Sequence, residues 1–194
     1  QSAVLAAENQ GEDLIVAEDA YVLLTADGWV KRQKEIKDTS TTRLREGDSV
    51  LACEIGSTRA SVVFFSNFGT AYTARIIDVP ATTGYGEPIQ KLFKLKDGER
   101  ILGMLSLDAR VVGKLGSEAD KRGDTFAVAA TSDGFGLAFG LEPLSTPSTR
   151  AGRRYAKPAE GAQVVGVEAA RGKETLIAVT RGRRALLCSV GEVS

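Results

Sequence analysis

The feature that most constrains this chain is an internal repeat. A short apolar strand, a turn around a glycine and a second strand recur four times, at 21–32, 62–74, 126–139 and 176–188. The turn glycines are Gly28, Gly69, Gly134 and Gly182. Because glycine adopts the positive φ that tight hairpin turns require, each copy predicts a β-hairpin.

A second block follows each of the first three hairpins. It is a glycine beside an acidic residue and then another apolar strand, at 45–55, 96–107 and 159–169. The fourth copy stops after its hairpin, which implies either strand exchange between repeats or a cut chain. All five prolines fall in the long connections between hairpin and third strand, away from the ladders that proline disrupts. We predict an all-β, propeller-like array of three and a half to four blades. The alternative is an irregular all-β sandwich.

The composition excludes several kinds of chemistry. The 194 residues contain 43% apolar and 26% charged residues, as is typical of a globular protein, and no histidine. A Ser-His-Asp triad, a Cys-His pair and a His-ligated metal are therefore impossible within the chain. Cys53 and Cys188 lie in apolar runs, and we expect both to be buried in a protein of a reducing compartment. A small-molecule enzyme is a poor interpretation.

The formal net charge of 0 conceals a gradient along the chain. Residues 1–62 contain 7 basic and 11 acidic side chains, a net of −4. Residues 63–124 contain 9 and 8, a net of +1, and residues 125–194 contain 9 and 6, a net of +3. Because DNA affinity comes largely from Lys and Arg on phosphates, a local positive stripe is enough for a nucleic-acid partner.

Basic residues on connections and turns are the candidate phosphate contacts. The stretch 150–157 contains no acidic residue and is the strongest of them. The bland alternative is that these are solvated charges on an ordinary β surface. The candidates are Lys31, Arg32, Lys34, Arg43 and Arg45 in repeat 1; Arg75, Lys91, Lys94 and Lys96 in repeat 2; Arg150, Arg153, Arg154 and Lys157 in repeat 3; and Arg181, Arg183 and Arg184 in the last hairpin.

Five segments carry a family resemblance: DGWVKR (27–32), GDSVLA (47–52), VVFFSNFGTAY (62–72), GYGEPI (84–89) and KLFKLKDGERIL (91–102). In this order and spacing they resemble the C-terminal domain of the A subunit of bacterial type II topoisomerases. The topoisomerase IV subunit is the most similar, chiefly through GWVKR and the Gly-x-Gly-Glu-Pro at 84–88. The resemblance runs from about residue 12 to the end.

The resemblance implies a β-pinwheel, in which four-stranded blades exchange strands with their neighbours. It implies a non-catalytic domain that binds and bends double-stranded DNA on its outer rim for a cytoplasmic, nucleoid-associated enzyme. Its protein partners would be the remainder of the A subunit, together with the ATPase B subunit. No catalytic residue, metal, cofactor or membrane contact is expected in this chain. A propeller-like protein-interaction module with little DNA binding is the alternative.

Two departures from the family pattern bear on function. Gyrase A subunits carry a Gln-Arg-Arg-Gly-Gly-Lys-Gly box in the first long connection, and residues 38–48 (DTSTTRLREGD) lack it. This favours a role like that of topoisomerase IV or of a divergent gyrase. The family domain usually has five or six blades, more than this chain supplies. We predict a linker at 1–11 and a pinwheel at 12–194, with repeats at about 12–60, 61–112, 124–172 and, in part, 173–194.

Overall fold

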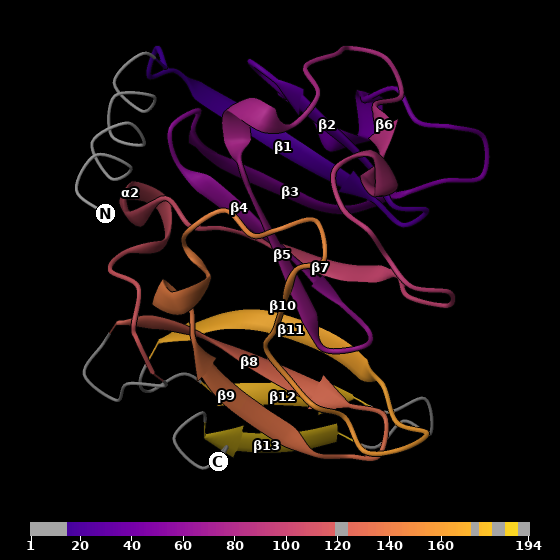
Figure 1. Ribbon diagram of the computed structural model, residues 1–194, viewed down its shortest axis with the longest axis vertical. Coiled ribbons are helices and arrows are strands. Elements are labelled where there is room, and N and C mark those ends of the chain that lie inside the picture. The colour runs from indigo at the N-terminus through magenta and orange to yellow at the C-terminus, as the bar shows by residue number, and fades with distance from the viewer. Residues whose placement is uncertain (1–14, 119–123, 172–174, 180–184, 190–194) are drawn as a thin grey trace.

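The computed structural model describes residues 15–118, 124–171, 175–179 and 185–189. Their strands form four antiparallel sheets stacked one after another (Figure 1). The first three sheets are each built on one repeat and are called blades 1, 2 and 3. The fourth is a two-stranded hairpin. The predicted linker at 1–11 lies outside the described residues, and the exact domain boundaries stay a prediction.

Each blade starts from a hairpin and adds its third strand on the far side of the first. Blade 1 contains β1 (Asp19–Thr25), β2 (Trp29–Gln33) and β3 (Val50–Ser57). Blade 2 contains β4 (Ser61–Ser66), β5 (Thr70–Arg75) and β7 (Ile101–Ser106). Blade 3 contains β8 (Thr125–Thr131), β9 (Gly136–Gly140) and β11 (Val164–Arg171), and the last hairpin is β12 (Thr175–Val179) with β13 (Ala185–Ser189). The predicted hairpins and third strands are confirmed.

The helices of the described residues are all short and lie in the segments that connect the strands. These are η1 (Thr39–Thr41), η2 (Ile76–Asp78), η3 (Ile89–Lys91), η4 (Glu142–Leu144) and, between blades 2 and 3, α2 (Ala109–Val112). Within the described part of the chain, no helix has the length and apolar character needed to cross a membrane.

Strand exchange joins successive blades. The two-residue strand β6 (Glu87–Pro88) comes from repeat 2 and pairs with β2 of blade 1. In the same way β10 (Arg153–Arg154) comes from repeat 3 and pairs with β5 of blade 2. Pro88 thus lies in a strand. Its missing N–H had predicted a position outside the strands. It is tolerated because β6 is an edge strand.

A glycine before each exchanged strand allows the close approach. Gly86 has φ +89°, and a Cβ there would lie 2.4 Å from the carbonyl oxygen of Val30. Gly152 has φ +70°, and a Cβ there would lie 2.8 Å from the carbonyl oxygen of Ala71. Real Cβ contacts are essentially never this short, so both positions require glycine for space as well as for backbone conformation.

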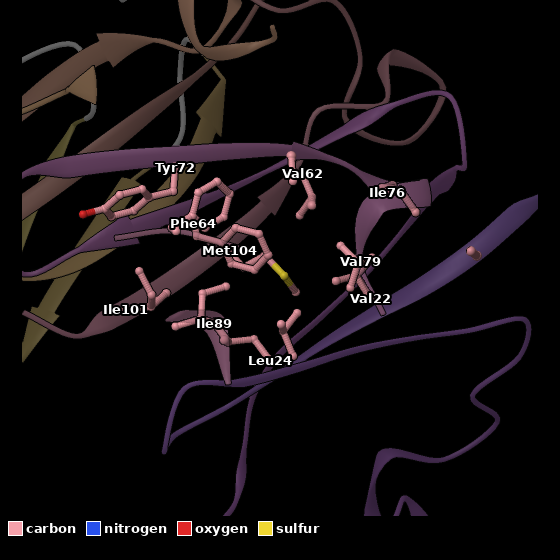
Figure 2. Close-up of a cluster of buried hydrophobic side chains, with 14 residues drawn as sticks. Val22, Leu24, Val62, Phe64, Tyr72, Ile76, Val79, Ile89, Ile101 and Met104 are labelled. Atoms are coloured by element: carbon pink, nitrogen blue, oxygen red, sulfur yellow. The ribbon is translucent and has the colours of Figure 1, made fainter. Parts of the chain in front are cut away.

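The hydrophobic core lies between the sheets. Val62 and Phe64 of β4 face blade 1 and pack in a cluster with Val22 and Leu24 (Figure 2). The alternate β4 residues, Val63 and Phe65, face blade 3 and join the next cluster. Successive side chains of a strand point to opposite faces, so a strand buried on both sides is apolar at every position. The run VVFF therefore reflects the position of blade 2 between two other blades.

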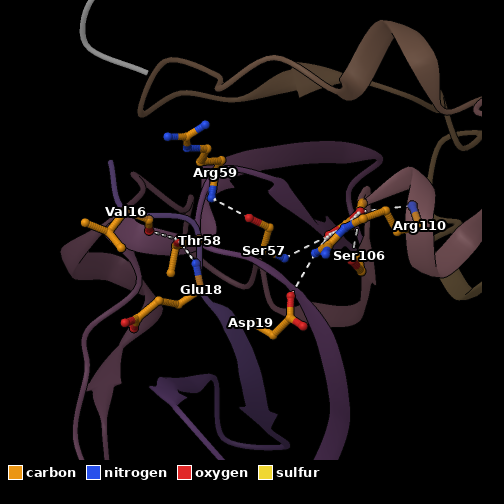
Figure 3. Close-up of polar contacts among 9 residues, drawn as sticks. Val16, Glu18, Asp19, Ser57, Thr58, Arg59, Ser106 and Arg110 are labelled. Atoms are coloured by element: carbon orange, nitrogen blue, oxygen red, sulfur yellow. Dashed lines mark hydrogen bonds and ion pairs between the residues drawn. The ribbon is translucent and has the colours of Figure 1, made fainter. Parts of the chain in front are cut away.

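A buried carboxylate fixes blade 1 to the segment after blade 2. Asp108 is 6% exposed, accepts a hydrogen bond from the backbone N–H of Ser57 at 2.8 Å and pairs with Arg110 at 2.7 Å. Arg110 also pairs with Asp19 at 2.8 Å (Figure 3). The hydrogen bonds from Arg110 and Ser57 hold the pKa of Asp108 at about 2, below its ordinary value.

Cys53 differs from the expectation. It lies in the edge strand β3 and is half-buried, not buried, and it forms no disulfide. Partial burial, with the neighbouring Glu54 carboxylate, raises the pKa of its thiol. The side chain of Cys188 lies outside the described residues.

Candidate nucleic-acid interface

One edge of each blade carries most of the candidate cations. The third strands β3, β7 and β11 lie beside one another, since β7 contacts both of the others. The opposite edge is formed by β2 with β6 in blade 1 and by β5 with β10 in blade 2. We call this edge, with the connections 34–49, 76–100 and 141–163, the rim.

The rim repeats a cation at an equivalent place in each blade. The turn glycines Gly47, Gly98 and Gly161 have φ of 78°, 75° and 77°, and each lies three residues before a third strand. The residue four before each glycine is Arg43, Lys94 or Lys157, and all three are exposed. The residues two before the first two glycines are Arg45 and Lys96, also exposed. The segments RLREGD and KLKDGE show this register in the sequence, but the predictions treated these residues as separate candidates.

Two cations of blade 1 lie over aromatic rings. The Arg45 guanidinium is 4.6 Å from the centroid of the Trp29 ring, and that of Arg43 is 5.9 Å from the centroid of Tyr85, which is 50% exposed. The Trp29 ring is half-buried beneath Arg45. An aromatic face orients a guanidinium and leaves its N–H groups available to an anion.

A second group of cations meets where the connections of repeats 2 and 3 touch. The backbone N–H of Lys94 donates to the carbonyl of Arg150 at 2.7 Å, and the Arg150 guanidinium donates to the carbonyl of Gln90 at 3.2 Å. Lys91 follows Gln90 in the chain and forms an ion pair with Glu87 at 2.8 Å. Lys91, Lys94 and Arg150, predicted separately, therefore form one exposed patch.

Three predicted contacts have structural partners instead. Lys31 is fully buried and donates to two carbonyls, and burial with the nearby Arg43 charge lowers its pKa. Arg32 is half-buried and donates to the carbonyls of Val79 and Ile77. Arg153 donates to the carbonyls of Pro143, Thr146 and Pro147 and to the Thr146 hydroxyl. Charge alone suggested these residues, but backbone carbonyls occupy their donors, so we leave them out of the interface.

The remaining predicted residues divide by exposure. Lys34, Arg154 and Lys157 are exposed on the rim, and Arg154 lies opposite Thr70 in the β10–β5 ladder. Arg75 is half-buried at the end of β5. Arg181, Arg183 and Arg184 lie outside the described residues. Throughout the described ranges, no group of three or more His, Cys, Asp or Glu side chains could hold a metal ion.

The fold and the relatives define the class of protein. No family model matches the chain. Among solved structures, it superposes on the C-terminal domain of E. coli ParC with a TM-score of 0.70 and 24% identity, covering 90% of this chain and 66% of that one. A topoisomerase IV C-terminal domain gives a TM-score of 0.76 and 20% identity, covering 93% and 55%. The fold is therefore the β-pinwheel of these domains.

The sequence relatives are more specific. The DNA gyrase A protein of Aeromonas salmonicida is 29% identical over 182 residues, which is 88% of this chain and 18% of that protein. The DNA topoisomerase 4 A protein of Caulobacter vibrioides is 28% identical over 99 residues, 50% of this chain and 13% of that protein. The chain thus spans less than a fifth of the length of these relatives. It is a homologue of type II topoisomerase A subunits, which confirms the resemblance seen in the sequence.

Proposed function

We propose that this chain is a non-catalytic DNA-binding and DNA-bending domain of a type II topoisomerase. It presents a DNA segment to a catalytic core in the bacterial cytoplasm, which the remainder of the A subunit forms with the ATPase B subunit. The observation that carries the proposal is the cation that recurs on the rim, Arg43 in blade 1, Lys94 in blade 2 and Lys157 after β10.

A repeated cation suits the DNA backbone better than base edges. Phosphates recur at regular spacing along a duplex, and side chains that neutralise them read no sequence. The three cations belong to successive repeats, so a duplex that contacts all of them has to follow the rim from blade to blade. A bent path costs deformation energy that depends on the flexibility of the sequence. We therefore expect a preference for deformable DNA and not for a fixed motif.

The test is the salt dependence of binding to a fluorescent duplex. A triple variant, R43A with K94A and K157A, should bind more weakly and lower the slope of log K against log salt by about 0.9 for each phosphate that is no longer neutralised. A matched triple, R59A with K114A and R171A, removes the same charge from exposed positions that lie outside the rim. It should leave the slope close to that of the unmodified chain.

Two results would overturn the proposal. One is the absence of salt-dependent duplex binding by the unmodified chain, and the other is an equal decrease in both triple variants. Bending is tested by energy transfer between dyes at the two ends of a duplex, which rises when the ends approach. A rise on binding that disappears in the rim triple supports a bent path, and unchanged transfer argues against it.

A further inference from the structure

Lys31 is the most deeply buried cation among the described residues. It is 0% exposed and lies in β2 directly opposite Leu23 of β1. Its ammonium donates to the carbonyl of Arg43 at 2.8 Å and to the carbonyl of Gly84 at 2.9 Å. Burying an ammonium inside a protein costs free energy unless its hydrogen bonds are satisfied. The Lys31 ammonium is therefore stable in this position only while both carbonyls accept its hydrogen bonds.

The two carbonyls belong to different repeats. Arg43 lies in the first long connection, and Gly84 lies in the segment that leads from repeat 2 into the exchanged strand β6. The side chain of Arg43 lies over the ring of Tyr85, the residue that follows Gly84. One buried lysine thus fixes the separation of the two backbone segments that bring this guanidinium and this ring together.

In blade 2, the long connection and the exchanged segment are joined by a backbone hydrogen bond, with no side chain between them. In the ladders, Val30 pairs with Glu87 and Ala71 pairs with Arg153, so Tyr72 occupies the place of Lys31 and Arg150 that of Gly84. There the backbone N–H of Lys94 donates directly to the carbonyl of Arg150. Tyr72 instead donates its hydroxyl to Glu99 at 2.7 Å.

We infer that Lys31 is a positioning residue for DNA binding, which places Arg43 and Tyr85 as one phosphate-binding unit built from two repeats. This inference rests on the proposed function. Without the ammonium, the connection and the exchanged segment lose their common partner, and Arg43 loses its fixed position on the rim. A phosphate contact then has to order this side chain at the moment of binding, which weakens the contact.

The test is a double-mutant cycle on DNA binding with the 194-residue chain. K31M should weaken binding to a duplex about five- to tenfold at ~0.1 M salt and lower the salt slope by about 0.9, as expected for one phosphate contact. R43A should do the same. K31M added to R43A should have little further effect, because Lys31 acts through Arg43.

The matched control is Y72F, at the equivalent position of blade 2. It removes the bond to Glu99 and lowers stability, but it leaves the Lys94–Arg150 junction in place. It should leave the salt slope unchanged, which separates positioning from general loss of stability. If K31M does not fold, K31Q, which keeps an NH₂ donor in a shorter side chain, takes its place.

The outcomes separate this inference from the proposed function. If the unmodified chain fails to bind duplex DNA, the proposed function fails. If it binds and a folded Lys31 variant binds equally well, only the inference fails. Additive effects of K31M and R43A would also overturn it, as would failure of both K31M and K31Q to fold, since Lys31 would then be a general structural residue.

Discussion

In blade 1 the long connection meets the exchanged segment through a buried ammonium, whereas in blade 2 the equivalent segments meet through a backbone hydrogen bond. The surroundings explain the difference. Tyr72 faces blade 1 and belongs to the core between the two sheets. Lys31 lies on the other face of blade 1, where the described residues supply no sheet. On that face of blade 1, a lysine with two carbonyl partners takes the place of the buried aromatic residue of blade 2.

The connections of the two repeats also differ in polarity. In repeat 2, Ile89 and Phe93 are buried in the core between blades 1 and 2. In repeat 1, the stretch before Arg43 reads DTSTT, and Asp38 begins the short helix η1 by accepting a hydrogen bond from the backbone N–H of Ser40. The blades thus share the position of their rim cations while the residues beneath differ. In this fold, the position of a rim cation therefore does not depend on whether the residues beneath it are polar or apolar.

The largest expected effect tests whether the two exchanged strands depend equally on glycine. G86A should cost at least about 3 kcal/mol, because positive φ strain adds to a backbone clash. G152A should cost somewhat less, since its Cβ would lie 2.8 Å from a carbonyl oxygen, compared with 2.4 Å at position 86. Urea unfolding of both variants measures the difference. Equal small losses would show that the exchanged strands add little stability.

A second prediction concerns the contact that keeps blades 1 and 2 in a fixed relation. D108N should cost about 2 kcal/mol, since it removes hydrogen bonds to a charged, buried carboxylate. The folded pKa of about 2 lies below the unfolded value near 3.9, so this contribution is complete above about pH 4 and is lost as pH falls toward 2.

Thermal unfolding between about pH 2 and 7 measures this contribution. The variant should be less stable than the unmodified chain at about pH 6, and the difference should narrow below about pH 4. If the difference in stability between the variant and the unmodified chain stayed constant across this pH range, ionisation of Asp108 would be excluded as the source of the difference.

The smallest effect sharpens the comparison of the exchanged strands. Glu87 in β6 occupies the place of Arg153 in β10, so one blade has an acid where the next has a base. E87Q removes a negative charge from the rim and releases Lys91 from its ion pair. Duplex affinity should rise about two- to threefold at about 50 mM salt, and the gain should fade as salt screens the charge. A fluorescence titration at two salt concentrations measures it, and unchanged affinity would place Glu87 away from the DNA path.

The sequence predicted the hairpins and third strands well because glycine spacing and apolar runs record them locally. The positions of Gly28, Gly69 and Gly134, all at positive φ, are direct examples. Strand exchange was expected from the resemblance, but the positions of the exchanged strands were missed because two residues carry no periodicity, and Pro88 indicated a connection. At the candidate site, Arg43 and Lys94 were predicted from their charge and their place on connections; both are exposed, and their contact with DNA stays a prediction.

The roles of Lys31 and Arg32 could not be predicted in this way. Their partners are carbonyls up to 53 residues away along the chain, and any residue type supplies a carbonyl. Nothing in the local sequence therefore distinguishes a lysine that binds two loops from one that extends into solvent. The pairing of Arg43 with Tyr85 was missed for the same reason, since it depends on how repeat 2 returns to blade 1.

Strand exchange has a consequence for the order in which a nascent chain acquires structure. Blade 1 has three of its strands once residue 57 has been made, but its fourth strand arrives only with residues 87 and 88. Blade 2 likewise waits for residues 153 and 154. Each of these two blades therefore remains open at its rim on the ribosome until the following repeat is partly synthesised, and completion of the two blades lags translation by about one repeat.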